Sequence, residues 1–193
     1  MKKRFGLFLL VVIVLLGCLF FMVYKSRMRP AAEAPQPAVQ EIRLEDFAYT
    51  PDTGYTFLPA PFGTSQEEML SLFGHSVSAL SSPYYAPTFE LLGLPFHYDA
   101  DFSQTGTLFF LAFNAAAPSK EPEKIEAAYA EALAYFESAF GTASESETTD
   151  TFTSKTWWAK DNANYFRLTC FYTNGIPSGL CFLLCEPQDL TKN

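Results

Sequence analysis

The hydrophobic and polar positions of this 193-residue chain separate an apolar beginning from a long remainder of short amphipathic patterns. The beginning, Phe5 to Tyr24, is a run of 20 residues without a charge. A helix rises about 1.5 Å per residue, so this run spans roughly the 30 Å core of a bilayer. Residues 1–29 are therefore predicted to be an N-terminal membrane anchor with a transmembrane helix. Residues 30–40 contain three prolines and predict an extended linker.

Two segments of the remainder, 41–193, have helical signals. Ser65 and Glu68 have the spacing of a capping box, and Gly74 marks the end of a short helix. A longer helix is predicted over 120–140, because apolar residues recur there at steps of three and four and Gly141 follows. Its apolar stripe consists of Ile125, Ala128, Tyr129, Ala132, Leu133, Phe136 and Phe140.

Other segments have the period of strands. Residues 96–102 alternate strictly, and 107–113 are apolar on both faces, so the two predict a hairpin. Three further strands are expected near 151–160, 165–172 and 179–186. A polar loop is expected over 143–151.

The order of these elements occurs twice. Phe-Gly ends the predicted helices at 73–74 and at 140–141, and the strand residues 105–113 align with 177–185. This repetition predicts tandem repeats over 57–117 and 118–187. The expected fold class is α+β, with two helix-plus-antiparallel-sheet halves in tandem behind the N-terminal transmembrane helix.

The first predicted helix also carries a family resemblance. Residues 62–74, Phe-Gly-Thr-Ser-Gln-Glu-Glu-Met-Leu-Ser-Leu-Phe-Gly, resemble the G-x-(S/T)-x-x-E-V-x-x-x-x-G helix of small envelope lipoproteins of the SmpA/OmlA type. The tandem order is similar to that of the β-lactamase inhibitory proteins. The resemblance implies a helix-on-antiparallel-sheet fold and a protein-binding role, and no functional residue is carried over. The first half lacks cysteine, unlike the inhibitor family, which has a disulfide in each half.

Charge is distributed unevenly along the chain. From Glu41 onward there are seven lysines and arginines against 20 aspartates and glutamates, a net charge of −13. A domain this acidic repels phosphate backbones, so nucleic-acid binding is not expected. Six basic residues flank the apolar run, where they suit lipid headgroups. They are Lys2, Lys3, Arg4, Lys25, Arg27 and Arg29.

The apolar run admits a second interpretation. Leu15-Leu16-Gly17-Cys18 resembles the lipobox of bacterial lipoproteins, which would make Cys18 a lipidation site. The residues that follow are apolar, whereas mature lipoproteins usually continue with small polar residues, so an uncleaved anchor is preferred. Either way the domain is tethered to a membrane. Basic residues are equal in number on the two sides, but a short N-terminal tail and an acidic domain on a linker favour a single-pass protein of the cell membrane with an extracytoplasmic domain.

The three cysteines of the domain are Cys170, Cys181 and Cys185. An odd number without a CxxC motif argues against a disulfide framework, and buried thiols are the preferred interpretation. A disulfide between Cys170 and Cys181 stays open as an alternative, because a reversal at 174–177 would place the two residues opposite each other in a hairpin.

Candidate chemistry is sparse. His97, Asp99 and Asp101 lie on one face of a predicted strand and could hold a divalent cation. A solvated strand face explains the same pattern, so neither a metal nor a cofactor is assigned. The chain has two histidines and no signature of nucleophilic or metal-dependent hydrolysis, so no catalytic residue is assigned either.

Two aromatic pairs are the candidate binding residues. Adjacent residues of a strand point to opposite faces, so one ring of Trp157-Trp158 is expected to point outward, and Tyr84-Tyr85 lies in a proline-flanked loop. An outward ring could stack on a sugar or anchor a protein. The predicted function is a non-enzymatic binding module for another protein or a cell-wall component. The alternative is an extracytoplasmic hydrolase that uses carboxylates.

Overall fold

A computed structural model describes residues 41–76, 89–115 and 121–187. These residues belong to one compact unit that covers 37–193. The predicted anchor, 1–29, and linker, 30–40, lie outside the described residues. Among the helices that are described, none combines the length and the apolar character needed to cross a bilayer.

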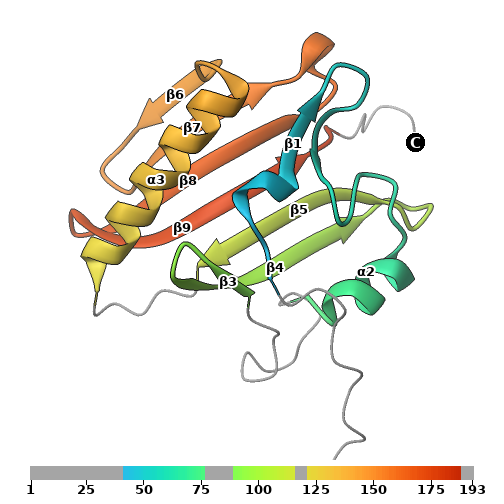
Figure 1. Ribbon diagram of the computed structural model, residues 1–193, viewed down its shortest axis with the longest axis horizontal. Coiled ribbons are helices and arrows are strands. Elements are labelled where there is room, and N and C mark those ends of the chain that lie inside the picture. The colour runs from blue at the N-terminus through green and yellow to red at the C-terminus, as the bar shows by residue number, and fades with distance from the viewer. Residues whose placement is uncertain (1–40, 77–88, 116–120, 188–193) are drawn as a thin grey trace, which may run out of the picture. The chain divides into compact units, whose positions relative to one another are not determined.

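Seven strands form a single antiparallel sheet (Figure 1). In spatial order they are β3 (Phe89–Leu91), β4 (Leu94–Phe102), β5 (Leu108–Ala115), β9 (Ile176–Cys185), β8 (Tyr165–Thr173), β7 (Phe152–Trp158) and β6 (Glu145–Thr148). The central pair is β5 and β9, with Phe110 opposite Cys185 and Asn114 opposite Cys181. Segments about 70 residues apart in sequence therefore lie side by side in the middle of the sheet.

The predicted fold class of two α+β halves in tandem is wrong. The described chain is mostly antiparallel sheet with two α-helices, and the strands expected in separate halves belong to one sheet. The physical reason lies in β5, whose residues Phe110 and Leu111 are apolar on opposite faces. An edge position would leave one row of its backbone donors and acceptors unpaired, and β9 supplies that pairing.

The ends of the helices coincide with capping residues in the sequence. In α2 (Gln66–Phe73) the predicted capping box is confirmed, since Ser65 Oγ accepts from the Glu68 amide at 3.3 Å and Glu68 accepts from the Ser65 amide at 2.9 Å. The longer helix, α3 (Pro122–Phe140), ends at Gly141, whose φ of 81° favours glycine. Two short 3₁₀ turns are η1 (Leu44–Asp46) and η4 (Lys160–Asn162).

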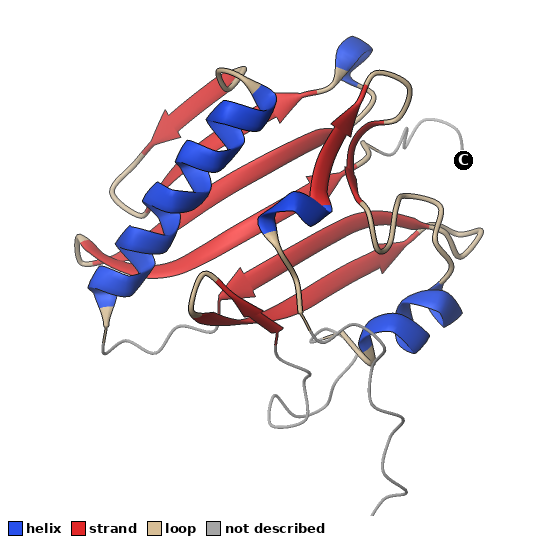
Figure 2. Ribbon diagram, in the orientation of Figure 1, coloured by secondary structure: helices blue, strands red, loops and turns tan. Residues whose placement is uncertain are grey.

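One face of the sheet is covered by α3 and by the hairpin of β1 (Phe47–Thr50) and β2 (Gly54–Phe57), with α2 beside β4 (Figure 2). The core between these layers is largely aromatic. The ring centroid of Phe136 lies 4.5 Å from that of Phe166, and Phe47 lies 5.4 Å from Phe182. Each aromatic ring buries a large area, so these rings account for much of the packing between the sheet and the elements that cover it.

A buried asparagine joins the β1–β2 hairpin to the loop before β8. Asn164 Oδ1 accepts from the Tyr55 amide at 2.9 Å, and Asn164 Nδ2 donates to the Thr53 carbonyl at 2.8 Å. Gly54 lies between these contacts with a φ of 73°, and a Cβ there would be 2.4 Å from Asn164 Oδ1. The turn therefore requires glycine at this position.

Two local predictions differ from the structure. The expected polar loop over 143–151 contains β6, an edge strand whose four side chains are all exposed. The spacing of Ile42, Leu44 and Phe47 also predicts the start of a strand, but the structure has η1 there and β1 begins only at Phe47. β6 has no apolar residue that would mark it as a strand, and the Asp46 carboxylate caps η1 by accepting from the Arg43 amide at 2.8 Å.

Candidate functional site

The candidate site is the face of the sheet that points away from α3, called here the open face. The helices and the β1–β2 hairpin contact residues of the other face, such as Phe113, Phe166 and Phe182. Side chains alternate along a strand, so the residues next to these point to the opposite side. No described helix or hairpin packs on that side.

The strand register aligns the side chains of the open face in rows. The first row, called here the aromatic row, crosses five strands from β4 to β7 and consists of Asp101, Phe110, Cys185, Tyr165 and Trp158. The next row consists of Asp99, Ala112, Leu183, Arg167, Thr156 and Glu145. Each row thus has an apolar middle and a carboxylate at the β4 border.

The middle of the open face is held together by specific contacts. The ring centroids of Trp158 and Tyr165 are 4.6 Å apart. The guanidinium carbon of Arg167 lies 5.3 Å from the Tyr165 ring centroid, within the range of a cation–π contact. Arg167 Nε also donates to Thr156 Oγ1 at 3.0 Å. These contacts fix the guanidinium between two neighbouring strands.

The groups beside Arg167 are neutral at physiological pH. Burial raises the pKa of the Tyr165 phenol to about 12. Burial also raises the pKa of the Cys185 thiol above its usual value, although a hydrogen bond with Tyr165 and the charge of Arg167 act in the opposite direction. Neither neighbour therefore supplies a negative charge to Arg167.

The two tryptophans divide between the faces. Trp157 is 1% exposed, packs in the core and donates its Nε1–H to the Gly141 carbonyl at 2.8 Å. It lacks the exposed surface that a binding role requires. Trp158 lies half-buried in the aromatic row, and its backbone amide donates to Ser144 Oγ at 3.1 Å. The other candidate residues, Tyr84, Tyr85 and Cys18, lie outside the described residues.

The three residues considered for a metal lie on the β4 border of the open face. In the described part of the chain no group of three or more His, Cys, Asp or Glu side chains could hold a metal ion. Asp99 Oδ1 is nevertheless buried and has no hydrogen-bond partner in the structure. The β4 border therefore presents one carboxylate oxygen that lacks a donor.

The hairpin of β8 and β9 does not bring Cys170 opposite Cys181. Thr173 pairs with Ile176 at the turn and a bulge follows between Phe171 and Tyr172, and together they place Cys170 opposite Leu180 and Cys181 opposite Thr169. A shift of one residue places the two thiols on opposite faces of the sheet, and both are free. The preferred interpretation of buried thiols is confirmed for these two cysteines.

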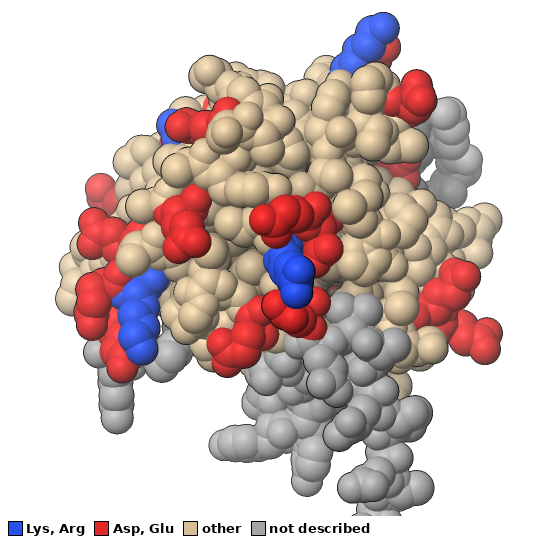
Figure 3. Space-filling model, viewed as in Figure 1, with Lys and Arg blue, Asp and Glu red and all other residues tan. Residues whose placement is uncertain are grey.

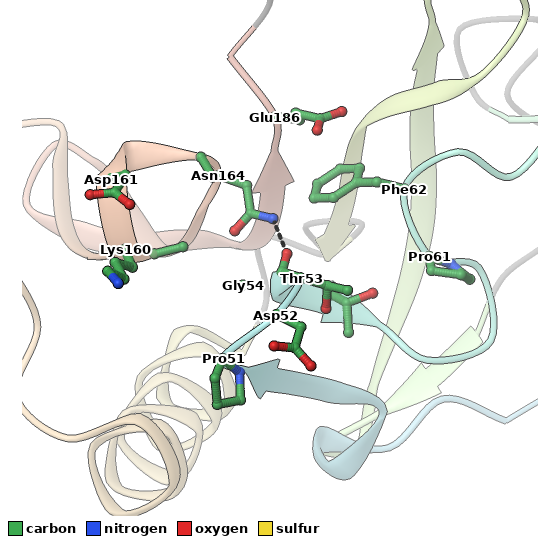
Figure 4. Close-up of a pocket in the computed structure, with 13 residues that line it drawn as sticks. Pro51, Asp52, Thr53, Gly54, Pro61, Phe62, Lys160, Asp161, Asn164 and Glu186 are labelled. Carbon is green, nitrogen blue, oxygen red and sulfur yellow. Dashed lines mark hydrogen bonds between the residues drawn. The ribbon is translucent and has the colours of Figure 1, made fainter.

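A second feature is a hollow of about 660 Å³ at the end of the sheet (Figure 4). Its wall includes the carboxylates of Asp52, Asp161 and Glu186, which come from the β1–β2 turn, from η4 and from the end of β9. In the close-up these carboxylates stand apart, and Asn164, which lies between them, is engaged with Thr53. The hollow is thus lined by carboxylates from three separate elements.

Charge surrounds the candidate site on both sides. Asp99 and Asp101 lie at the β4 border of the open face, and Glu145 and Glu147 lie at the β6 border. The covered face, which Figure 3 shows, also carries many more carboxylates than basic groups. Arg167 is the single lysine or arginine among the described side chains that the strand register places on the open face.

Sequence reasoning missed Phe110, Tyr165 and Arg167 as members of the site. Each lies in a segment predicted as a strand, and the alternation of Tyr165, Arg167 and Thr169 was visible. Their meeting with Trp158 depends on the β7–β8 and β8–β9 registers. The feature of the sequence that could have indicated the site is Arg167, which alternates with Tyr165 and Thr169 in a domain that is otherwise rich in aromatic and acidic residues.

Comparisons with known proteins give little further information. No family model matches the chain, and no curated protein matches it. Among solved structures, the chain is similar to a DUF4309 family protein (YjgB) from Bacillus subtilis, with 7% sequence identity and a TM-score of 0.39. The match covers 64% of this chain and 79% of that protein.

Proposed function

We propose that this protein is a non-enzymatic binding module whose open sheet face docks another protein. The observation that carries the proposal is the aromatic row with Arg167 beside it. Aromatic residues and arginine are the types most enriched among residues that dominate binding energy in interfaces. The open face also bears no described helix or hairpin, unlike the opposite face.

The dimensions of the open face suit a protein rather than a single sugar unit. Strands lie about 4.8 Å apart, so the five strands from β4 to β7 span roughly 20 Å. Four alternate residues along β8, Tyr165 to Phe171, span roughly another 20 Å. An area of this size is the central part of a typical protein interface, which buries about 800 Å² on each partner.

The charges at the borders of the open face indicate which kind of partner surface would fit it. Carboxylates border the apolar middle on the β4 and β6 sides. A partner with an apolar patch and lysines or arginines around it would match these acidic borders. A second copy of this chain would place acidic borders against acidic borders, since a two-fold interface uses the same patch on both subunits.

The location that we propose is the one expected from the sequence. The uncharged run from Phe5 to Tyr24 would anchor the chain in the cell membrane, and residues 30–40 would present the domain outside the cytoplasm. The resemblance of residues 62–74 to envelope-lipoprotein helices agrees with this location. An anchored acidic surface without an assigned catalytic group supports binding rather than hydrolysis.

The test is photocrosslinking of the full chain in its own membranes. A benzoylphenylalanine in place of Phe110 puts the probe in the aromatic row, and the same probe in place of Tyr49 is the control. Tyr49 is an aromatic residue of the β1–β2 hairpin with 42% of its surface exposed. We expect a protein adduct from position 110 that Trp158→Ala reduces, and no such adduct from position 49. Equal adducts from both positions, a cell-wall adduct, or none from position 110 would contradict the proposal.

A further inference from the structure

The side chain of Arg167 is held in a fixed position on the open face. Its Nε donates to Thr156 Oγ1 at 3.0 Å, and its guanidinium carbon lies over the Tyr165 ring at 5.3 Å. Thr156 is only 2% exposed, and Tyr165 is held in turn by Trp158. The guanidinium is therefore positioned before any partner arrives.

Among the described residues, none forms an ion pair with the terminal nitrogens of this guanidinium. The ion pairs found in the described part of the chain join Arg43 to Glu41 and Lys124 to Glu121, and neither involves Arg167. Along the row, the backbone of Glu145 is two strands from that of Arg167 and the backbone of Asp99 is three strands away, roughly 10 and 14 Å. The adjacent phenol and thiol are neutral, as described above.

We propose that Arg167 is the specificity-determining residue of the open face and pairs with a carboxylate at the centre of the partner's apolar patch. The proposal rests on the proposed function. The planar fork of a guanidinium binds a carboxylate through two parallel hydrogen bonds, which fix direction as well as charge. Here Nε is already engaged, so the two terminal nitrogens, Nη1 and Nη2, are the donors available.

The surroundings select the kind of anion. The domain has a net charge of −13, which disfavours multiply charged anions such as phosphate esters and nucleic acids. Leu183, which lies opposite Arg167 on β9, is apolar, and Phe110 lies in the adjacent aromatic row, so the anion must be carried by an apolar group that covers this part of the open face. An aspartate or glutamate among apolar side chains of a protein meets both conditions. The partner's basic groups would then face the acidic borders.

The two tryptophans of the chain make a direct test possible. Full-length protein in detergent, labelled with 5-fluorotryptophan, gives one ¹⁹F signal from Trp158 on the open face and one from Trp157 in the core. Benzoate is the probe, because it joins a carboxylate to an apolar ring. Benzamide, of the same shape but neutral, is its matched control.

We expect benzoate to shift the Trp158 signal saturably, with an apparent Kd at least about fivefold below that of benzamide. The Trp157 signal should stay in place. Arg167→Gln should abolish the preference for benzoate, and Arg167→Lys should retain only part of it because lysine lacks the planar fork. Lys155→Gln is the matched control, since Lys155 lies on the opposite face of the neighbouring strand, and it should leave the preference unchanged.

Three results would overturn the inference: no saturable shift with benzoate, equal affinity for benzoate and benzamide, or an unchanged preference in Arg167→Gln. The Trp157 signal reports whether each variant is folded, and Arg167→Lys gives the comparison if Arg167→Gln unfolds. The measurement needs no partner. Loss of the carboxylate preference together with intact crosslinking at position 110 would therefore refute this inference alone.

Discussion

Two buried tyrosine hydroxyls of the domain differ in their hydrogen bonding. Tyr98 Oη donates to the Gly74 carbonyl at the end of α2. Tyr129 Oη, on α3, is buried and has no partner in the structure. A buried unsatisfied hydroxyl costs about 1–3 kcal/mol, whereas a satisfied one contributes about 1 kcal/mol. The same substitution should therefore have opposite effects at the two positions.

We predict that Tyr129→Phe raises the free energy of unfolding of the domain by about 1 kcal/mol and that Tyr98→Phe lowers it by about 1 kcal/mol. Urea unfolding followed by circular dichroism measures both. Each variant removes one oxygen from a tyrosine, so each is the control for the other. A similar loss at both positions would mean that Tyr129 has a partner after all.

At the scale of single residues, the sequence predicts that neighbouring side chains of a strand point to opposite faces of the sheet. It does not predict which of the two faces is the buried one. The Trp157-Trp158 pair was expected to split between two faces, and it does. Which ring points inward depends on the side of the sheet that α3 covers, and no residue near the pair encodes that. The cysteines show the same limit, because one bulge residue in β9 changes which thiol faces which residue.

At the scale of an element, α3 is the part of the fold that depends most on a single side chain. Phe136 is 0% exposed and has rings of Phe47, Phe166 and Phe182 within 6.0 Å. It lies where the helix meets both the hairpin and the sheet. Truncation there leaves a cavity among rings that belong to three layers.

We predict that Phe136→Ala lowers the free energy of unfolding by about 3–5 kcal/mol. Chemical denaturation of the domain gives the value. Glu137→Ala is the control on the exposed side of the same helix, and it should stay within about 0.5 kcal/mol of the parent. A loss below about 1 kcal/mol at Phe136 would show that the core repacks around the missing ring.

Helices were easier to locate than strands for a local reason. The ends of α2 and α3 depend on Ser65, Gly74 and Gly141, which act within one turn. β6 has four exposed polar residues, and its pairing with β7 alone makes it a strand. Its two glutamates suit an edge position, where charge discourages pairing with other chains.

At the scale of the whole molecule, the attachment of the domain is a prediction from the sequence. Full-length protein should sediment with membranes, and removal of residues 1–30 should make the domain soluble, because the uncharged run supplies the anchor. Labelled palmitate distinguishes the two kinds of anchor. Incorporation that Cys18→Ser abolishes would replace the uncleaved helix with a lipid anchor.

The fold class could not be predicted because its decisive contact is non-local. Patterns in 96–113 and 165–186 identify strands, yet nothing within either segment states that β5 and β9 are neighbours. The open face depends on the same pairing, since it places Phe110 beside Cys185 and Tyr165. The site is formed by the register of strands that are far apart in sequence. The sequence therefore shows its residues one by one but does not show that they meet.

The central pairing of β5 with β9 also determines when the chain can finish folding. Strand β9 begins at Ile176, about 60 residues after β5 ends at Ala115, so β5 has one unpaired edge until β9 has been synthesised. Contacts between segments that are far apart in sequence slow folding. An apolar strand edge that is still unpaired also favours aggregation. The β3–β4–β5 segment therefore exposes the edge of an apolar strand until β9 is in place.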